Sequence, residues 1–211
     1  MHVSEGVLSA PVLVTGAVAA VAGVSAGLKK LNLDQVAQTG MLAAAFFVAS
    51  FIHVPIGPSS VHLVLNGIVG LLLGWTAFPA IFTALLLQAM LFQYGGLTTL
   101  GINTVIMALP AVFGHYLCRP FLFSRPGVTI TAAFACGAGA VLISGLLVAL
   151  SLVCSGAYFL ETAGLVVAAH VPVMVIEGLI TVFCVGFLKK VKPELLPGYL
   201  AHDAAASLPL P

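Results

Sequence analysis

A histidine follows the first methionine directly, and this pair could ligate a metal ion. The stretch MHVSEG precedes every long apolar segment. A free α-amine at Met1, the backbone nitrogen of His2 and the His2 imidazole would close two adjacent chelate rings on one ion. These nitrogens fill three corners of a square plane, as Ni²⁺ and Cu²⁺ prefer, and imidazole also suits cobalt and zinc. Because ligation releases protons, we expect the affinity to fall in acid. The alternative is that His2 is an arbitrary polar residue at a frayed end.

The open fourth corner needs a donor from elsewhere, and His62 and His53 are the candidates. His62 stands in the stretch GPSSVHLVLNG. Ser59 and Ser60 can cap a helix start, which would fix His62 in the first helical turn beside Ser60. His53 ends the preceding apolar segment. The alternative for both histidines is an ordinary interfacial residue at a helix end.

Two asparagines could support such a site. Asn66 lies one helical turn after His62 and could accept the His62 ring N–H, as partners of metal-ligating histidines do. Asn103 follows a loop expected on the same membrane face and could line the same mouth. The alternative for each is an ordinary hydrogen bond between helices.

The composition defines the class of protein that must position these residues. Of 211 residues, 61% are hydrophobic and 6% are charged, whereas a soluble domain carries about 25% charged residues. The apolar runs are continuous, unlike the alternating strands of a membrane barrel. The sequence therefore predicts an all-α polytopic membrane protein. Because no Lys or Arg precedes the first apolar segment and Glu5 does, we expect no cleavable signal peptide.

The apolar segments and basic residues predict the topology. A span needs about 20 apolar residues, and we expect seven, at residues 8–28, 38–54, 60–75, 78–93, 101–118, 128–153 and 159–188. The 7 basic residues then share one side, which the positive-inside rule makes cytoplasmic. The N-terminus, His53 and His62 would lie outside and the C-terminus inside. We expect one domain over residues 1–192, with a metal-binding segment at 1–6, and a loosely ordered cytoplasmic tail at 193–211.

His170 and Glu177 are ionisable residues inside the last predicted span. Such residues are costly in a membrane and are candidates for function. Their spacing of seven puts both near one helical face. They could form a second metal station or a coupling site for a partner. The alternative is a hydrogen-bonded pin between helices.

The first predicted span carries a stripe of small residues. Small residues at a spacing of four let helices approach closely. The stripe could dock a partner helix or could serve ordinary packing within the chain. Its members are Ala19, Ala22, Gly23, Ala26 and Gly27.

The sequence resembles the CbiM/NikM family, the substrate-binding S components of energy-coupling-factor transporters for cobalt and nickel. The matching stretches are MHVSEG, PIGPSSVHLVLNGIVGLLLG, YGGLTTLGINTVIMALPA and HVPVMVIEGLITVFCVGFLKKVKPELL. They span nearly the whole chain, and the initial Met-His is the most specific. The resemblance implies an ion bound by the Met1 amine, the His2 backbone nitrogen, the His2 imidazole and one further histidine, which matches His62. The loop before His62 departs from the family pattern at Ile56 and Pro58, so its neighbouring contacts do not carry over.

The resemblance also implies a capture subunit that does not hydrolyse ATP. Its partners would be a transmembrane T component, ATPase subunits and, as an optional part, a small accessory membrane subunit. The sequence agrees, because it contains no G-x-x-x-x-G-K-[ST] loop. We therefore expect an inner-membrane importer subunit for Ni²⁺ or Co²⁺, with no organic cofactor and no nucleic acid partner. Planar nitrogen coordination favours nickel.

Two other functions remain open from the residues alone. One is an intramembrane metal-dependent enzyme that uses His170 and Glu177 as ligands. The sequence lacks the H-E-x-x-H motif, which argues against it. The other is a passive metal channel, which would conduct ions without an ATPase.

Overall fold

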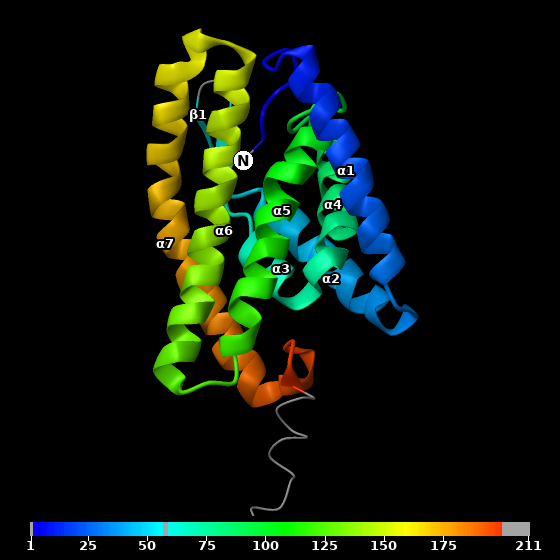
Figure 1. The fold of residues 1–211 in the computed structure, drawn as a ribbon, viewed down its shortest axis with the longest axis vertical. Coiled ribbons are helices and arrows are strands. Elements are labelled where there is room, and N and C mark those ends of the chain that lie inside the picture. The colour runs from blue at the N-terminus through cyan, green and yellow to red at the C-terminus, as the bar shows by residue number, and fades with distance from the viewer. Residues whose placement is uncertain (1, 57–58, 200–211) are drawn as a thin grey trace, which may run out of the picture.

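A bundle of antiparallel helices forms the protein (Figure 1). The computed structural model describes residues 2–56 and 59–199, apart from the side chains of residues 53–62 and 157. The helices are α1 (Ala10–Lys30), α2 (Leu33–Ala49), α3 (Asn66–Leu73), α4 (Ala77–Phe92), α5 (Leu100–Cys118), α6 (Pro126–Ser155) and α7 (Leu160–Val191). A hairpin of strands β1 (His53–Ile56) and β2 (Ser59–His62) separates α2 from α3.

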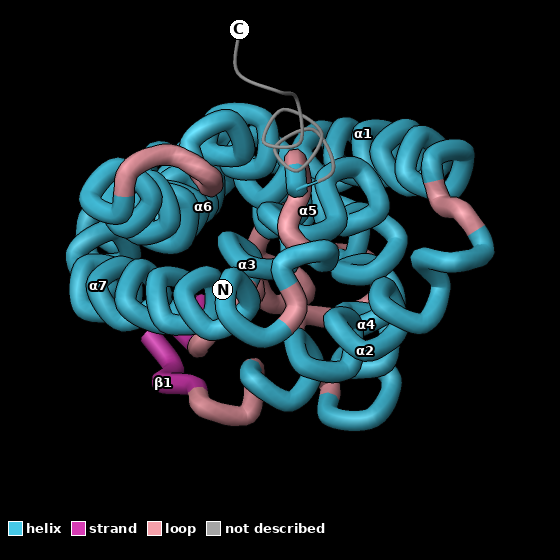
Figure 2. Tube along the Cα trace, turned by 90° about the horizontal axis from the view of Figure 1, so that it is seen from below, coloured by secondary structure: helices cyan, strands magenta, loops and turns pink. Residues whose placement is uncertain are grey.

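The short helix α3 lies in the middle of the bundle. It packs against α5, α6, α2 and α7. In Figure 2 the other helices surround α3, and the two strands lie at the edge beside α7. Helices α6 and α7 form one long antiparallel pair, while α1 packs on α4 and α5. The centre of the bundle is therefore built around a helix that does not itself cross it.

The predicted span at residues 60–75 is wrong. Residues 59–62 form strand β2, and α3 has 8 residues, a rise of about 12 Å against about 30 Å of hydrocarbon. Pro55 favours an extended edge strand over a helix, and residues 59–62 are the strand that pairs with it. Among the described residues, 5 helical stretches are long and apolar enough to cross a membrane, with α3 and α4 joined as Asn66–Phe92. Helix α2 is shorter, at 17 residues, so a count of seven spans is not confirmed.

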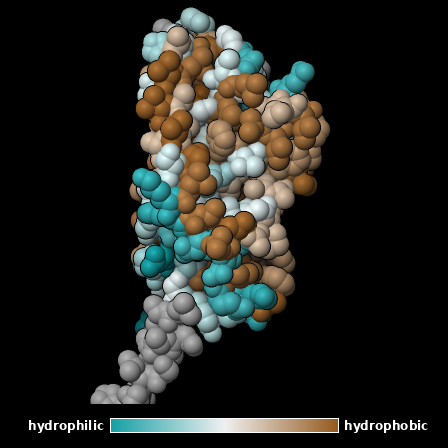
Figure 3. Space-filling model, turned by 90° about the vertical axis from the view of Figure 1, so that its right-hand side faces the viewer, coloured by the Kyte–Doolittle hydropathy of each residue, from teal (hydrophilic) through white to brown (hydrophobic). Residues whose placement is uncertain are grey.

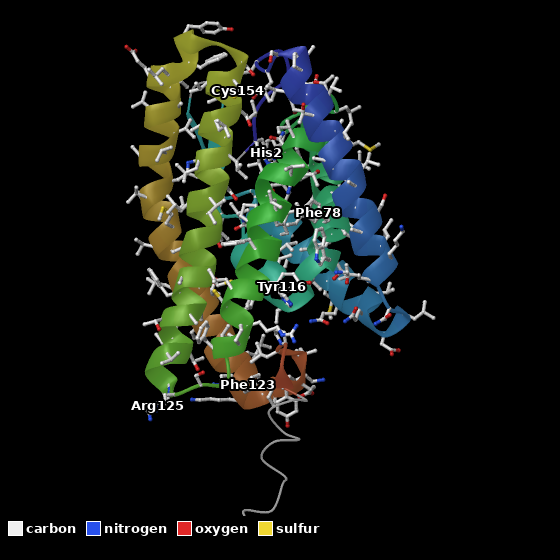
Figure 4. All side chains as sticks on the ribbon, viewed as in Figure 1. His2, Phe78, Tyr116, Phe123, Arg125 and Cys154 are labelled. Carbon is white, nitrogen blue, oxygen red and sulfur yellow. The ribbon has the colours of Figure 1, made fainter. Side chains whose placement is uncertain are left out.

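The segments that carry the basic residues lie at one end of the bundle, the lower end in Figure 1, where α1, α5 and α7 end and α6 begins. Lys29 and Lys30 close α1, and Lys30 lies 5.1 Å from the centre of the Trp75 ring. Lys189 donates a hydrogen bond to the Leu122 carbonyl at 2.7 Å. Figure 4 shows Arg125 at this end and His2 in the opposite half. The charge asymmetry needed by the positive-inside rule is present, and the side of the membrane for each end stays a prediction.

The outer surface is strongly apolar, as a lipid-facing surface must be. Val21 on α1, Met90 on α4 and Phe183 on α7 are all well exposed. Figure 3 shows apolar side chains over much of one face and hydrophilic ones gathered toward the lower end. With its membrane-length helices, the chain is a multi-pass membrane protein.

The small-residue stripe of α1 is partly used inside the chain. A Cβ at Gly23 would lie 2.3 Å from the Phe78 ring, and one at Gly27 would lie 2.5 Å from Pro79 Cδ. These glycines let α4 touch the α1 backbone, which matches the alternative of ordinary packing within the chain, and docking of a partner helix on the stripe stays a prediction. The other members remain exposed or half-buried: Ala19, Ala22 and Ala26.

The start of the predicted loose tail is ordered. Pro193–Leu195 form a short helical turn, and Leu196 is 2% exposed. The Tyr199 and Phe123 rings lie 5.9 Å apart. An apolar anchor at Leu196 therefore extends the folded part to residue 199, and residues 200–211 lie outside the described residues.

Candidate metal centre

The N-terminal segment runs into the bundle. His2 is 4% exposed and Val3 is 0% exposed. Asn103 of α5 accepts a hydrogen bond from the Val3 N–H at 3.0 Å and donates one to the Val3 carbonyl at 3.1 Å. One side chain thus satisfies both backbone polar groups of Val3, as a neighbouring strand would. His2 is held in the upper half of the bundle by this pairing (Figure 4).

The loop between α4 and α5 lies over His2. The Tyr94 ring centre lies 6.2 Å from that of His2, and the rings are tilted by 31°. Gly95 has φ +75, and a Cβ there would lie 2.8 Å from Asn103 Nδ2 and 3.6 Å from His2 Nδ1. Only glycine suits this backbone angle and this contact. The close approach therefore brings the loop backbone against the imidazole.

Glu5 fastens the same loop a second time. Its Oε1 accepts hydrogen bonds from the Thr98 N–H at 2.9 Å and the Thr98 hydroxyl at 3.1 Å. The Glu5 N–H donates to the Gly95 carbonyl at 3.1 Å. The hydrogen bonds from Thr98 lower the pKa of the Glu5 carboxyl, since they favour its charged form. Glu5 is therefore a carboxylate at neutral pH and binds the N-terminal segment to the loop.

The hairpin brings the backbones of the two candidate donor histidines together. His53 pairs directly with His62 across the antiparallel strands. Strand β2 contacts α7, and the hairpin shares the upper half of Figure 1 with the N-terminus. The predicted Ser59 and Ser60 helix cap is wrong, because both residues belong to β2 and α3 begins at Asn66.

Several predicted ligands and neighbours fall outside the described side chains. These are Met1, His53, Ser60 and His62. The structure therefore places His2 and the hairpin backbone at one end of the molecule, and the ligation itself stays a prediction.

Asn66 takes part in helix packing. Its Nδ2 donates to the Met107 carbonyl at 3.3 Å and to Ser144 Oγ at 3.0 Å. It thereby joins α3 to α5 and α6. The predicted position one turn below His62 on a shared helix is wrong, because His62 lies on a strand. These contacts match the alternative of an interhelical hydrogen bond.

His170 and Glu177 are both buried on α7 but have separate contacts. His170 Nδ1 hydrogen-bonds to the Val166 carbonyl of its own helix. Glu177 Oε1 accepts hydrogen bonds from the backbone N–H groups of Val64 and Leu65. Among the residues that the structure describes, no three His, Cys, Asp or Glu side chains lie close enough to hold one metal ion. The pair is therefore not part of a described ligand cluster.

Sequence reasoning missed the residues that fasten the N-terminal segment. Glu5, Thr98 and Gly95 were not predicted as site residues. The loop 93–99 was expected on the same face as the N-terminus, and that expectation was the available signal. No periodicity or motif joins Glu5 to a threonine 93 positions away, so this contact follows from the fold.

Comparisons with known proteins point to metal transport. The family described as "CbiM: Cobalt uptake substrate-specific transmembrane region" matches residues 2–195. A "Putative metal transport protein" of Haemophilus influenzae is 43% identical over 199 residues, which cover 93% of this chain and 97% of that relative. The "Fused nickel transport protein NikMN" of Rhodobacter capsulatus is 31% identical over 223 residues, covering 93% of this chain and 64% of that relative.

A solved structure agrees with these relatives. A crystal structure described as a truncated transition metal transporter is similar with a TM-score of 0.73 and 25% sequence identity. The similarity covers 90% of this chain and 99% of that chain. The likeness therefore extends over nearly the whole helical bundle.

Proposed function

Because this chain belongs to the CbiM cobalt-uptake family, we propose that it is the substrate-capture subunit of an ATP-driven energy-coupling-factor importer for Ni²⁺ or Co²⁺. Membership makes it a metal-transport component of the inner membrane and not an enzyme. The alternative of an intramembrane enzyme built on His170 and Glu177 is therefore set aside.

The proposed ligands are the Met1 amine, the His2 backbone nitrogen, the His2 imidazole and a nitrogen of His62. The observation that carries this proposal is the double hydrogen bond between Asn103 and Val3. A frayed terminus would expose His2 to solvent, whereas here it is 4% exposed. The hairpin backbone that bears His62 lies in the same half of the bundle. Nitrogen donors in a plane suit Ni²⁺ best, and cobalt accepts the same imidazoles.

The proposed topology puts the capture site outside the cell. Arg125 lies at the end of the bundle opposite the half that holds His2 (Figure 4), where the lysine-bearing ends of α1 and α7 also lie, and basic ends face the cytoplasm. The ion would be bound at the outer end and released inward when partner subunits hydrolyse ATP. A T component, ATPase subunits and an accessory subunit are the proposed partners. The fused nickel relative supports such partners, because the matching region there is part of a longer transport polypeptide.

Blocking the α-amine tests this function most simply. We would titrate Ni²⁺ and Co²⁺ by calorimetry into untagged protein whose intact mass retains Met1. Adding Gly-Ser before Met1, or acetylating Met1, should abolish measurable binding while the circular dichroism spectrum stays unchanged. The matched control carries the same two residues after Pro211 and should bind normally. Unchanged affinity in the N-terminally extended protein would exclude the amine as a ligand.

Two further measurements separate capture from the other functions. His2→Ala should lose binding and His170→Ala should keep it. Affinity should fall as the pH drops below about 8, because the amine must lose its proton before it binds. A passive channel would instead move the ion into liposomes without an ATPase, and the capture proposal expects no such flux.

A further inference from the structure

The Glu177 carboxylate lies where strand β2 passes into helix α3. Glu177 is 0% exposed, near the middle of α7. Its Oε1 accepts a hydrogen bond from the Leu65 N–H at 2.7 Å and another from the Val64 N–H. Val64 and Leu65 are two of the three residues between His62, the end of β2, and Asn66, the start of α3. A side chain of α7 therefore fixes the connection that follows the candidate metal ligand.

This connection needs an acceptor from outside its own segment. The first N–H groups of a helix have no intrahelical acceptor. Leu65 is the N-cap residue of α3, has φ 56 and provides no side-chain cap. Inside a membrane bundle, water cannot easily replace the missing partner. A carboxylate at a helix start is also favoured by the helix dipole. Glu177 thus caps α3 from a helix that lies more than 100 residues further along the chain.

The contacts on either side of Glu177 fix the base of the hairpin. On the hairpin side of the Glu177 contact, the Leu63 N–H donates to the Ile52 carbonyl at 3.0 Å and closes the base of the hairpin. Below it, Asn66 joins α3 to α5 and α6. The segment at 64–65 has no regular secondary structure of its own. The position of this segment depends on its two hydrogen bonds to Glu177. The orientation of β2, which runs into the segment, therefore depends on them too.

We propose that Glu177 is a positioning residue for the metal site, which holds Val64 and Leu65 and thereby sets the His62 donor in place. It does not itself bind the ion. This inference rests on the proposed function, in which His62 is the fourth ligand. Among the described residues, no cluster of three metal-ligating side chains includes Glu177. Its Oε1 is occupied by the backbone N–H groups of Val64 and Leu65, and its Oε2 is buried without a hydrogen-bond partner among the described residues.

Two conservative variants distinguish positioning from a role of the charge. Glu177→Gln keeps an oxygen at the same reach without the charge, whereas Glu177→Asp keeps the charge and withdraws the oxygen. Calorimetry with Ni²⁺ on untagged protein should show wild-type affinity for Glu177→Gln. It should show a loss of roughly 10–100-fold for Glu177→Asp, as for other partners that orient metal ligands. The reverse order would overturn the inference, because the charge would then act on the ion.

A matched control variant and hydrogen exchange at residues 64–65 distinguish a local loss of the Glu177 contact from a general folding defect. Thr181→Val removes a buried hydroxyl one turn away, whose hydrogen bond goes to the Glu177 carbonyl within α7. It should leave the affinity unchanged. Hydrogen exchange in the metal-free protein should speed up at residues 64–65 in Glu177→Asp and not in Glu177→Gln. Unchanged exchange at these amides in Glu177→Asp would contradict the proposal that Glu177 holds this segment in place.

A double-mutant cycle with His62 tests the route of the effect. His62→Ala should weaken Ni²⁺ binding, and adding Glu177→Asp should weaken it no further. Additive losses would overturn this inference alone, because Glu177 would then act elsewhere. Unchanged binding in His62→Ala would overturn the proposed ligand set and this inference with it.

Discussion

Two buried side chains hold irregular backbone in this bundle, and they do so differently. Asn103 binds the Val3 N–H and carbonyl, and both its amide oxygen and its amide nitrogen have partners. Glu177 binds the N–H groups of Val64 and Leu65 through Oε1 alone. Its Oε2 is buried and has no hydrogen-bond partner among the described residues.

The two side chains differ in the free-energy cost of burying them. A neutral amide with every polar atom paired adds little penalty to a buried site. A carboxylate with one oxygen unpaired in a membrane interior is expensive. The amide of Asn103 is therefore fully paired. Glu177, by contrast, is an ionisable residue at a position where a neutral acceptor could also satisfy the N–H groups of Val64 and Leu65. The two proposed parts of the metal site, the N-terminus and the His62 hairpin, depend on these two clamps.

The largest effect is expected from breaking the N-terminal clamp. Asn103→Ala leaves two buried polar groups of Val3 unpaired, at about 1–3 kcal/mol each. The N-terminal segment should leave its position, and Ni²⁺ affinity should fall roughly 10–100-fold. Thr104→Val is the matched control, since its hydroxyl donates to the Leu100 carbonyl within the same helix, α5. Calorimetry on both variants checks this, and equal affinities would show that the Val3 pairing does not hold the site.

A smaller effect should follow from pushing the loop away from His2. Gly95→Ala introduces a Cβ 2.8 Å from Asn103 Nδ2 at a residue with φ +75. The left-handed backbone alone costs about 1–2 kcal/mol for alanine, and 1.4 kcal/mol is a factor of ten in affinity. The metal-free variant relieves this strain by moving the loop away from His2, and binding must restore it, so we expect roughly tenfold weaker Ni²⁺ binding.

The control for this loop variant is Gly127→Ala. A Cβ at Gly127 meets nothing within 4 Å, so its affinity should match the wild type. If the Gly95 variant bound Ni²⁺ as tightly as the Gly127 variant, the loop could not be in contact with a rigid His2.

The smallest effect concerns the exposed Glu5 contact and its pH dependence. Hydrogen bonds from Thr98 lower the pKa of Glu5, so the contact stabilises the fold above the ordinary pKa of about 4.3. That stabilisation is lost as the pH falls through the lowered pKa. The protection of the Thr98 amide in metal-free protein, taken as its exchange rate relative to the intrinsic rate at the same pH, should fall in that acid range. In Glu5→Gln no such transition should occur at Thr98, and an identical pH profile in both proteins would count against the contact.

The general class of the fold could be predicted from composition, but the strand and short helix at the centre of the bundle could not. Continuous apolar runs predict the long helices α1, α5, α6 and α7. The run at residues 60–75 has the same composition, yet it divides into a strand and an 8-residue helix. Local apolarity cannot distinguish a membrane span from a buried helix that other helices surround. Pro55, just before this run, was the available warning, because it favours an extended strand, with which residues 59–62 then pair.

The metal site was predictable in its chemistry and not in its support. Adjacent Met1 and His2 indicate chelation from residue types alone. Asn103 could be expected near the site, because the loop before it was predicted on the same membrane face as the N-terminus. For Glu177 the sequence could predict a hydrogen bond between helices but not its partner. The partner is a backbone N–H at the turn from β2 into α3, and that turn is known only from the fold. Contacts between segments about 100 residues apart arise from packing and leave no local pattern.

The central claim is that the N-terminus itself supplies three ligands in a plane. Magnetic susceptibility and visible absorption of the untagged protein loaded with Ni²⁺ test it most directly, because Ni²⁺ is diamagnetic in a square plane of nitrogens and paramagnetic in an octahedral site. Four nitrogens from Met1, His2 and His62 predict a diamagnetic, planar Ni²⁺ centre. A paramagnetic, six-coordinate centre that persists after Met1 is acetylated would contradict this ligand set.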